Sequence, residues 1–240
     1  LRVGHISTTQ VRDAHFNLRI LPDRNQIELD QSNWIAGNFR ARMIGGLRPV
    51  DPELGYGGPI EFELIADPAA GSPTVAGEQS VPIAMRAGGR LDPAQKRIDI
   101  STVSIFTGED RADGSASIVF GGLTPAISAA GASAGMPVAV IKQIWPFWLA
   151  SPARDWTFRN IHGGRLTDIS LEAAVPAGII GRIRFGARME PQQFRMAAAF
   201  NDVRFDTFGE LPPVVDARGR LELAGMGFRG HLGTGRGIPP

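Results

Sequence analysis

The sequence has no cysteine and only two lysines among its 240 residues. The absence of cysteine excludes disulfide bonds and thiolate metal sites, and it is compatible with an oxidising compartment without requiring one. Twenty-three arginines accompany the lysines, but they are scattered singly among apolar residues, and the net charge is +1. Nucleic-acid-binding proteins concentrate basic side chains in patches or runs, so we do not expect a nucleic acid as partner.

A long apolar run is also missing. The uncharged stretch around the tryptophans, residues 143–152, is flanked by Lys142 and by Arg154 and Asp155. It is about half as long as the roughly 20 apolar residues that a membrane-spanning helix needs. The chain begins with Leu1 and shows no charged-then-apolar leader. We therefore expect a processed chain or a piece of a longer one, with any membrane anchor outside it.

Most of the chain alternates apolar and polar residues, the pattern of half-buried β-strands. Residues 15–48 and 60–67 alternate in this way, and further strand candidates follow the tryptophan-rich region at 165–175, 179–189, 193–205 and 219–232. The turns between them are rich in glycine and proline. The sequence predicts a mainly β protein built on one long, curved antiparallel sheet.

One hairpin is predicted from residues 96–108 and 114–123, with its turn near residues 109–114. Asp113 and Gly114 form a dipeptide that favours tight turns. The small residues that follow, up to residue 135, lack strong strand formers and look like a linker.

A short two-helix insert is predicted near residues 137–161. Pro137 can open the first helix, and Pro146 would kink or end it by removing a backbone donor. Ser151 is a good N-cap with proline after it, so a second helix should cover residues 153–160. The chain thus divides into a β-rich segment, a helical insert and a β-meander that continues the same sheet: residues 1–135, 136–162 and 163–240.

The tripeptide Gly-Arg-Leu occurs three times, at residues 89–91, 164–166 and 219–221. A strand candidate accompanies each copy, but the spacings are unequal. A regular solenoid should have a fixed period, so we interpret the repeat as similar units that extend one sheet.

A sheet with one apolar face must cover that face with a second layer, with itself or with a ligand. Two short helices cannot cover ten or so strands, and this deficit is the main functional indication from physical reasoning alone. A register slip of one residue would turn every side chain to the other face. If no strand slips in this way, the alternation gives ten candidates for the lining of an apolar groove: Ile98, Ile100, Ile118, Phe120, Ile183, Phe185, Met196, Phe200, Leu221 and Leu223.

Catalytic motifs are weak. Residues 131–135 match the Gly-x-Ser-x-Gly spacing of a hydrolase, but the residues before Ser133 make a poor strand for a nucleophile elbow. The carboxylates of residues 109–113 lack the ligand spacing of a calcium loop. The four histidines are far apart in the sequence and form no zinc motif. We expect no enzyme activity, no metal and no cofactor.

Two segments resemble a known family. Residues 145–172, "WPFWLASPARDWTFRNIHGGRLTDISLE", are similar to the Trp-Pro, Ala-Arg-x-Trp and Gly-Gly-x-Leu signature of the AsmA-like envelope proteins, in the YhdP branch that is related to TamB. Residues 211–237, with Leu-Pro-Pro before a Gly-x-Leu strand, resemble the same branch. The residues that carry the resemblance, expected to be structural, are Trp145, Pro146, Arg154, Trp156, Gly163 and Gly164.

The resemblance implies a large Gram-negative protein that is held in the inner membrane by a helix outside this chain and crosses the periplasm. Its long curved sheet would carry phospholipid between the inner and outer membranes. Phospholipid acyl chains, neighbouring β-segments of the same protein and other envelope proteins are then the expected partners. This chain is far shorter than those proteins and lacks the anchor, so it would be one segment of such a bridge.

Two other hypotheses remain open. The apolar face or an exposed sheet edge could bind another protein by strand addition, which would make the chain a periplasmic assembly module for outer-membrane biogenesis without lipid carriage. A serine hydrolase that uses Ser133 is the third hypothesis.

Overall fold

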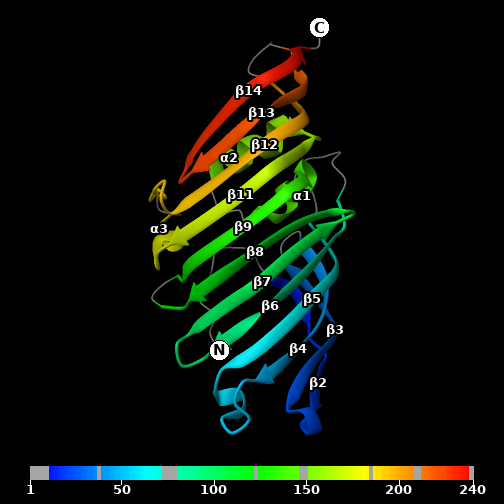
Figure 1. Cartoon of the computed structure of the whole chain (residues 1–240), viewed down its shortest axis with the longest axis vertical. Helices are drawn as coiled ribbons and strands as arrows, with labels where there is room; N and C mark the ends of the chain where they lie inside the picture. Colours follow the sequence, from blue (N-terminus) through cyan, green and yellow to red (C-terminus); the bar gives the residue numbers. More distant parts are fainter. Residues whose placement is uncertain are drawn as a thin grey trace.

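The protein forms a single long antiparallel sheet of 14 strands with helices against one face (Figure 1). The computed structural model describes residues 11–36, 39–71, 80–121, 124–145, 151–183, 186–207 and 212–237. Nearly all neighbouring strands follow one another in the sequence, so the sheet is a meander that runs from β1 and β2 at one end to β14 at the other. The predicted mainly β fold with one long antiparallel sheet is confirmed.

The strands of the first half are β1 (Val11–His15), β2 (Leu18–Leu21), β3 (Gln26–Ala36), β4 (Phe39–Pro49), β5 (Ile60–Gly71), β6 (Ile83–Asp92), β7 (Arg97–Thr107), β8 (Asp110–Val119) and β9 (Ala126–Pro137). Those of the second half are β10 (Ile161–His162), β11 (Arg165–Val175), β12 (Phe194–Phe205), β13 (Val214–Ala224) and β14 (Gly227–Gly237). Strand β9 pairs with β11, so the helical segment interrupts the sequence but not the sheet.

The two-helix insert is present where it is predicted. Helix α1 (Val138–Ile144) follows β9 directly, and helix α2 (Ser151–Asn160) leads into β10. Both lie behind the strands β9 to β12 in Figure 1. Two short 3₁₀ turns, Pro22–Arg24 and Gly55–Gly57, lie in loops of the first half.

Three local predictions are corrected. The turn between β7 and β8 falls at Gly108 and Glu109, where Gly108 adopts a left-handed φ of 58°, so Asp113 and Gly114 lie inside β8. Glycine takes that conformation without steric cost, which places the turn five residues earlier than the Asp-Gly dipeptide suggests. The expected linker before residue 135 is the twelve-residue strand β9, stabilised by pairing on both sides.

The third correction concerns the strand predicted at residues 179–189. Residues Ile179–Ile183 form a short helix, α3, instead. The apolar residues Ile179, Ile180 and Ile183 all belong to or pack against the core cluster of the C-terminal half. Their spacing does not follow the alternation that a strand requires. Packing of three closely spaced apolar residues on one side of a helical turn overrides the β propensity of isoleucine here.

The Gly-Arg-Leu repeat has a structural explanation. Gly89 in β6 faces Phe62 of β5, and Gly219 in β13 faces Phe200 of β12, so in both copies a phenylalanine ring lies over the glycine of the neighbouring strand. The remaining copy, at residues 164–166, has Gly164 at a φ of 81°, against Val203. In each copy the glycine leaves room for an adjacent apolar side chain.

The core consists of two apolar clusters, both on the helix side of the sheet. One lies between α1 and the strands β4, β5, β6 and β9, with Ala69, Met136 and Val140 completely buried. The other joins both helices to the strands β11, β12 and β13, and it includes Val138, Phe194 and Leu223. Because α1 contributes to both clusters, it connects the two halves of the sheet.

Candidate functional site

The two faces of the sheet differ in chemistry. We call the face against which α1 and α2 pack the apolar face. Most cross-strand partners there are apolar or glycine, because the antiparallel register brings residues of the same pattern opposite one another, although the buried Ser32 and Ser133 also lie on this face. One such row joins residues of seven neighbouring strands: Pro49, Ile60, Leu91, Ile98, Ile118, Ile127 and Val175.

The longest row crosses eleven strands, from β3 to β14. Adjacent strands lie about 4.8 Å apart, so the row is roughly 50 Å long. Every member is apolar or glycine: Leu29, Gly45, Leu64, Ala87, Val103, Gly114, Gly131, Leu171, Met196, Leu223 and Phe228. The apolar face is therefore continuous along the long axis of the sheet.

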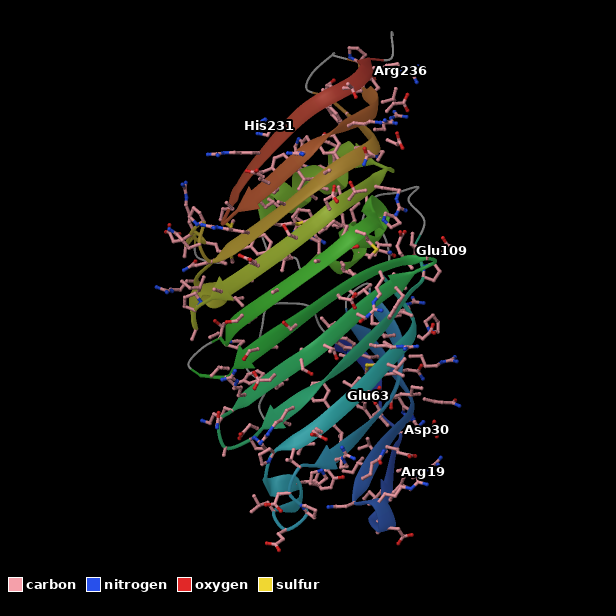
Figure 2. All side chains as sticks on the ribbon, in the orientation of Figure 1. Arg19, Asp30, Glu63, Glu109, His231 and Arg236 are labelled. Carbon is pink, nitrogen blue, oxygen red and sulfur yellow. The ribbon has the colours of Figure 1, made fainter. Side chains whose placement is uncertain are left out.

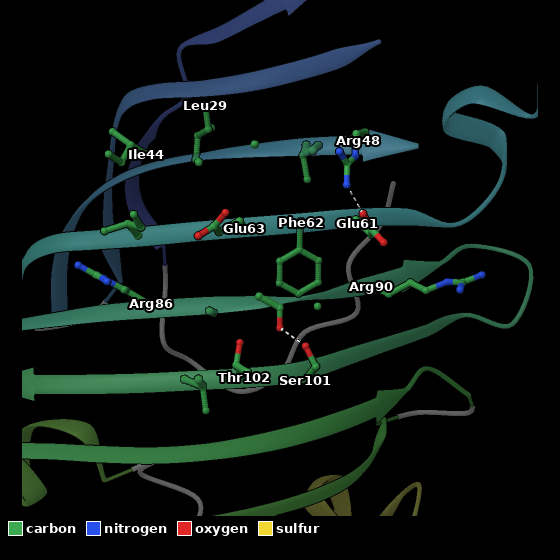
Figure 3. A pocket seen from close by; sticks show the side chains of 18 of the residues that line it. Leu29, Ile44, Arg48, Glu61, Phe62, Glu63, Arg86, Arg90, Ser101 and Thr102 are labelled. Atoms are coloured by element: carbon green, nitrogen blue, oxygen red, sulfur yellow. Dashed lines mark hydrogen bonds and ion pairs between the residues drawn. The ribbon is translucent and has the colours of Figure 1, made fainter. Parts of the chain in front are cut away.

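The opposite face carries charged side chains, which Figure 2 shows projecting from the ribbon at Arg19, Asp30 and Glu63. Over strands β2 to β8 it is hollowed, with a volume of about 1330 Å³ (Figure 3). Ion pairs cross this hollow from strand to strand, including Arg48 with Glu61 at 2.7 Å. The hollow is larger than the apolar cavity described next, but its wide opening and its paired charges suit water better than hydrocarbon.

Hydrogen bonds fix the charge state of this charged face. The guanidinium of Arg97 and the hydroxyl of Ser117 lower the pKa of Asp99. The pKa of Asp113 is lowered in the same way, by Ser104 first and then by Arg111. Both carboxylates therefore stay ionised at neutral pH, which keeps this face wet.

An apolar cavity of about 190 Å³ lies on the other face, between the two helices and strands β11 to β14. Apart from Lys142, Thr157 and the indole N–H groups of two tryptophans, its lining side chains are apolar. Besides Lys142 and Thr157, the lining residues are Val138, Ile141, Trp145, Trp156, Ile161, Leu166, Met196, Phe200, Val203, Phe205, Leu221, Leu223, Phe228, Gly230 and Leu232. This cavity is the candidate functional site.

The cavity is closed at its floor and open at one edge. Val138, Leu166 and Leu223 at the floor are 3%, 6% and 2% exposed, whereas Phe228 and Leu232 on the edge strand β14 are 42% and 52% exposed. The ring centroid of Trp156 in α2 lies 5.8 Å from that of Phe228. The contact between these two rings marks the mouth of the cavity.

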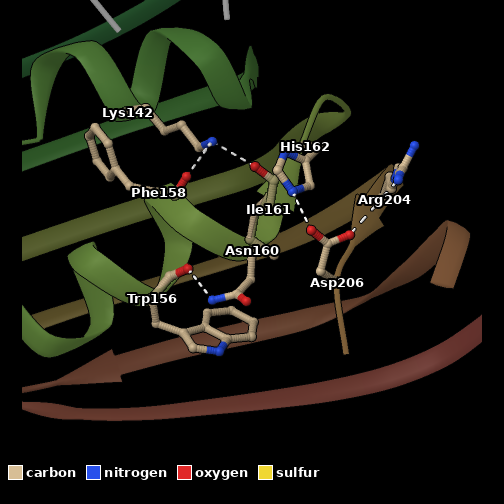
Figure 4. A network of polar contacts seen from close by, with 8 residues as sticks. All are labelled: Lys142, Trp156, Phe158, Asn160, Ile161, His162, Arg204 and Asp206. Atoms are coloured by element: carbon tan, nitrogen blue, oxygen red, sulfur yellow. Dashed lines mark hydrogen bonds and ion pairs between the residues drawn. The ribbon is translucent and has the colours of Figure 1, made fainter. Parts of the chain in front are cut away.

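Lys142 holds the helical cover in place (Figure 4). This lysine is only 3% exposed, and its ammonium donates hydrogen bonds to the carbonyls of Phe158 at 3.4 Å and Ile161 at 2.6 Å. These carbonyls lie at the C-terminal end of α2, where helical carbonyls lack partners and a cation is favoured. A side chain of α1 thus caps α2.

Arg154 makes the second link between the helices. Its guanidinium donates a hydrogen bond to the carbonyl of Trp145 at 3.3 Å and lies over the ring of Phe158, 4.1 Å from the centroid. Burial lowers the pKa of Arg154, which remains far above neutral for a guanidinium. The arginine of the Ala-Arg-x-Trp segment therefore joins the end of α1 to the first turns of α2.

The two glycines after α2 form the turn that returns the chain to the sheet. Gly163 and Gly164 have left-handed φ angles of 67° and 81°. A Cβ on Gly164 would collide with Val203, and the Gly164 carbonyl accepts a hydrogen bond from the amide of Val138 at the start of α1. Only glycine fits this position.

His162 and Asp206 hold the end of the cover against the sheet. The Nε2 atom of His162 lies 2.9 Å from the carboxylate of Asp206, whose other oxygen is 3.9 Å from Arg204 (Figure 4). The amide of Asp206 donates to the carbonyl of Asn160, the last residue of α2. These contacts position Ile161 and Phe205 in the wall of the cavity.

The structure brings four of the ten predicted groove residues together in the cavity: Met196, Phe200, Leu221 and Leu223. Ile98, Ile100 and Ile118 lie on the same apolar face, in the rows that cross β7 and β8. Phe120 follows β8 and is 43% exposed. Ile183 lies in α3 and packs against the core, so its expected place on a groove-lining strand is wrong. Phe185 and Pro146 fall outside the described residues.

Sequence reasoning missed the residues at the mouth. Phe228 and Leu232 lie on the edge strand, and Trp156 was assigned only a structural role. The spacing of Phe228, Gly230 and Leu232 is the same period-two signal as that of Leu221 and Leu223, so the strand pattern contained them. Val138 and Ile141 come from α1, and the sequence does not show which helical residues meet which strand.

Ser133 does not lie at a strand-to-helix turn. It occupies the interior of β9 and is 8% exposed. Its hydroxyl lies 2.7 Å from the carbonyl of Arg111 and 3.0 Å from that of Gly135, and it accepts from the amide of Gly135. Each of these partners is a main-chain atom, which is how a buried hydroxyl satisfies its hydrogen bonds within a strand.

The described residues contain neither a membrane-spanning helix nor a metal-binding cluster. No helix in this part of the chain is long and apolar enough to cross a membrane. Histidine, aspartate and glutamate side chains do not gather there in a group of three or more that could hold a metal ion.

Together these features define a class of protein: a one-layer antiparallel sheet with a charged face, a continuous apolar face and a helix-covered apolar cavity at one end. No protein family, curated protein or solved structure matches the chain.

Proposed function

We propose that this chain is a segment of a bridge-like protein that carries phospholipid between the inner and outer membranes of a Gram-negative bacterium. Acyl chains would lie along the apolar face, and no catalytic group would be needed. The observation that carries the proposal is the eleven-strand row of apolar side chains and glycines from Leu29 to Phe228. From Leu29 to Leu171 its members are half-buried, whereas Met196 and Leu223 are buried in the core with the helices, so hydrocarbon would lie along the uncovered part of the row.

The physical basis is the non-directional character of hydrophobic contact. A methylene group gains about 0.8 kcal/mol when it is buried from water, whatever apolar side chain it touches. Successive positions along a uniform row therefore have similar free energies, so an acyl chain can move along it without a deep trap. The three glycines and the one alanine of the row leave room above the strands for such an acyl chain.

The resemblance of residues 145–172 and 211–237 to the YhdP branch supports the location. On this proposal the segment works in the periplasm, and a helix outside the chain holds the full protein in the inner membrane. Neighbouring β-segments would continue the sheet beyond its edges. The outer edge of β14 pairs with no strand of the described residues, which is compatible with such a continuation.

Organic extraction of the purified chain followed by mass spectrometry tests the proposal. The chain is prepared without detergent, and an unrelated β protein is the control. We expect phospholipid in near-stoichiometric amount in the extract of this chain alone. Absence of phospholipid from a folded preparation that is also offered phospholipid vesicles would contradict the proposal.

The alternative is a periplasmic assembly module, and the edge strand β14 favours it. All eleven residues of β14 are exposed, and a long unpaired edge is a template for strand addition. A protein partner that pairs with β14, together with the absence of retained lipid, would favour this function over lipid carriage.

A further inference from the structure

We propose that the helix-covered cavity is a discrete binding site for a single hydrocarbon chain, which enters tail first between Trp156 and Phe228. This inference rests on the proposed function for its class of ligand. The bound hydrocarbon chain could belong to a phospholipid or to a single-chain amphiphile. It adds one defined, saturable site to an apolar face that would otherwise bind lipid without preference.

The size of the cavity sets the ligand. An engineered apolar cavity of about 150 Å³ stays dry and binds benzene, whereas drug-sized ligands need pockets of roughly 300 Å³ or more. At about 190 Å³, this cavity has room for part of one acyl chain and none for a headgroup or a second chain. The lining also suits an acyl chain, because leucine, phenylalanine and valine side chains provide the walls of the cavity.

The exposure of the lining residues sets the direction of entry. Side chains at the floor are almost completely buried, as Val138 and Leu223 show, and exposure rises toward Phe228 and Leu232 on the edge strand. A methyl end would therefore reach the floor, and a polar headgroup would remain in water beside β14. His231, labelled on this strand in Figure 2, is a polar and exposed residue.

An empty cavity of this size is unfavourable in a native core, because its lining atoms lose packing partners. The cover over it is nevertheless fixed by specific contacts: Lys142 to the end of α2, Arg154 to the end of α1, and Asp206 to Asn160. These bonds fix α2 over the cavity, where it meets β14 through the Trp156 and Phe228 rings at the mouth. A ligand that fills the space would compensate for the lost packing.

Gly230 offers a way to fill the cavity from the protein side. It lines the cavity, and a Cβ there would make only ordinary contact with the Phe228 ring, 3.5 Å away. Gly237 on the same strand is the matched control, because a Cβ there would also meet only ordinary contact, at 3.9 Å, and it does not line the cavity. Gly230→Phe should block the site, and Gly237→Phe should leave it free.

The probe is a lysophosphatidylcholine with a brominated acyl chain, titrated into the full chain below its micelle concentration while tryptophan fluorescence is followed. Bromine quenches tryptophan only at short range, and Trp145 and Trp156 both line the cavity. We expect saturable quenching with one probe per chain. Gly230→Phe should weaken it by about tenfold or more, the equivalent of about two methylene groups left in water, and Gly237→Phe should not.

A second pair of variants covers the case in which Gly230→Phe fails to fold. Leu232→Asp places a carboxylate at the exposed mouth, and His231→Asp places the same charge on the next residue, outside the cavity lining. The first should weaken probe binding and the second should not. Equal effects in both pairs, or no saturable binding by the parent chain, would overturn the single-chain site.

The lipid extraction described above separates the two proposals. Phospholipid retained equally by Gly230→Phe and by the parent chain, without saturable probe binding, would refute the cavity site and leave the proposed function standing. Saturable binding of the single-chain probe without any phospholipid retention would support the cavity site and refute phospholipid carriage.

Discussion

Gly219, in the middle of β13, shows how closely neighbouring strands and rings approach in this sheet. The ring of Phe200 covers Gly219, and a Cβ at Gly219 would collide with that ring and with the carbonyl of His231. Because Phe200 also lines the cavity, the glycine sets the position of a wall residue. Glycine in a strand interior is otherwise unfavourable, so this close approach is the reason for its presence.

We expect Gly219→Ala to destabilise the protein by about 1–3 kcal/mol, the usual cost of overpacking. Chemical denaturation followed by circular dichroism measures the change. Gly57→Ala is the control, because nothing lies within 4 Å of a Cβ at Gly57. A Gly219→Ala protein as stable as the control would show that the strands can move apart at little cost.

An ion pair between two strands makes the stability of the fold depend on pH. Arg165 of the second Gly-Arg-Leu copy makes a two-bond ion pair with Asp110, joining β11 to β8 across β9. The hydrogen bonds from Arg165 lower the pKa of Asp110 below its usual value. A lowered folded-state pKa gives a stabilising contribution that is present above the unfolded value of about 3.9 and is lost as the pH falls through the folded value.

Asp110→Asn should therefore reduce stability at pH 7 and have a smaller effect with each step of acidification below about pH 4. Urea denaturation of both proteins at a series of pH values measures the difference. The exposed pair Arg236 and Asp216 on the edge strand, removed by Asp216→Asn, serves as comparison. A difference for Asp110→Asn that does not shrink in acid would contradict the assignment.

At the scale of elements, a buried lysine of α1 stabilises the C-terminal end of α2. Lys142→Met keeps the length of the side chain but leaves the carbonyls of Phe158 and Ile161 without the ammonium donor. An acceptor that loses its partner costs about 1–3 kcal/mol. We expect faster amide hydrogen exchange in α2, with the central strands unchanged. Lys96→Met, the same substitution at the chain's other lysine in the exposed turn before β7, should leave α2 protected.

The elements also show what sequence reasoning can and cannot supply. Helix α2 was predictable because Ser151 and Pro152 are local start signals. Strand β9 was not, because its alanines, glycines and serines have low β propensity and its stability comes from pairing with β8 and β11. Of the cavity, the wall residues Met196 and Leu223 follow from alternation, whereas the helical wall and the mouth depend on tertiary contacts.

At the scale of the whole molecule, the sheet separates charge from hydrocarbon on its two faces. Ion pairs hold the charged face in water, and the helices cover only one part of the apolar face. Ser115 and Ala116 in β8 show the separation at two adjacent residues: Ser115 is exposed, and Ala116 is half-buried in the row between Ile100 and Ala129. This pair allows the apolar face to be tested by itself.

We expect Ala116→Glu to reduce phospholipid retention strongly and Ser115→Glu to leave it unchanged. Both variants add the same charge to the same strand, but only the first places a carboxylate where acyl chains would lie, and an unpaired carboxylate against hydrocarbon costs several kcal/mol. Lipid recovery is measured by extraction and mass spectrometry, and circular dichroism checks the fold. If the two variants retained equal amounts of lipid, the apolar rows would not be the path, and strand addition at β14 would become the better account of this protein.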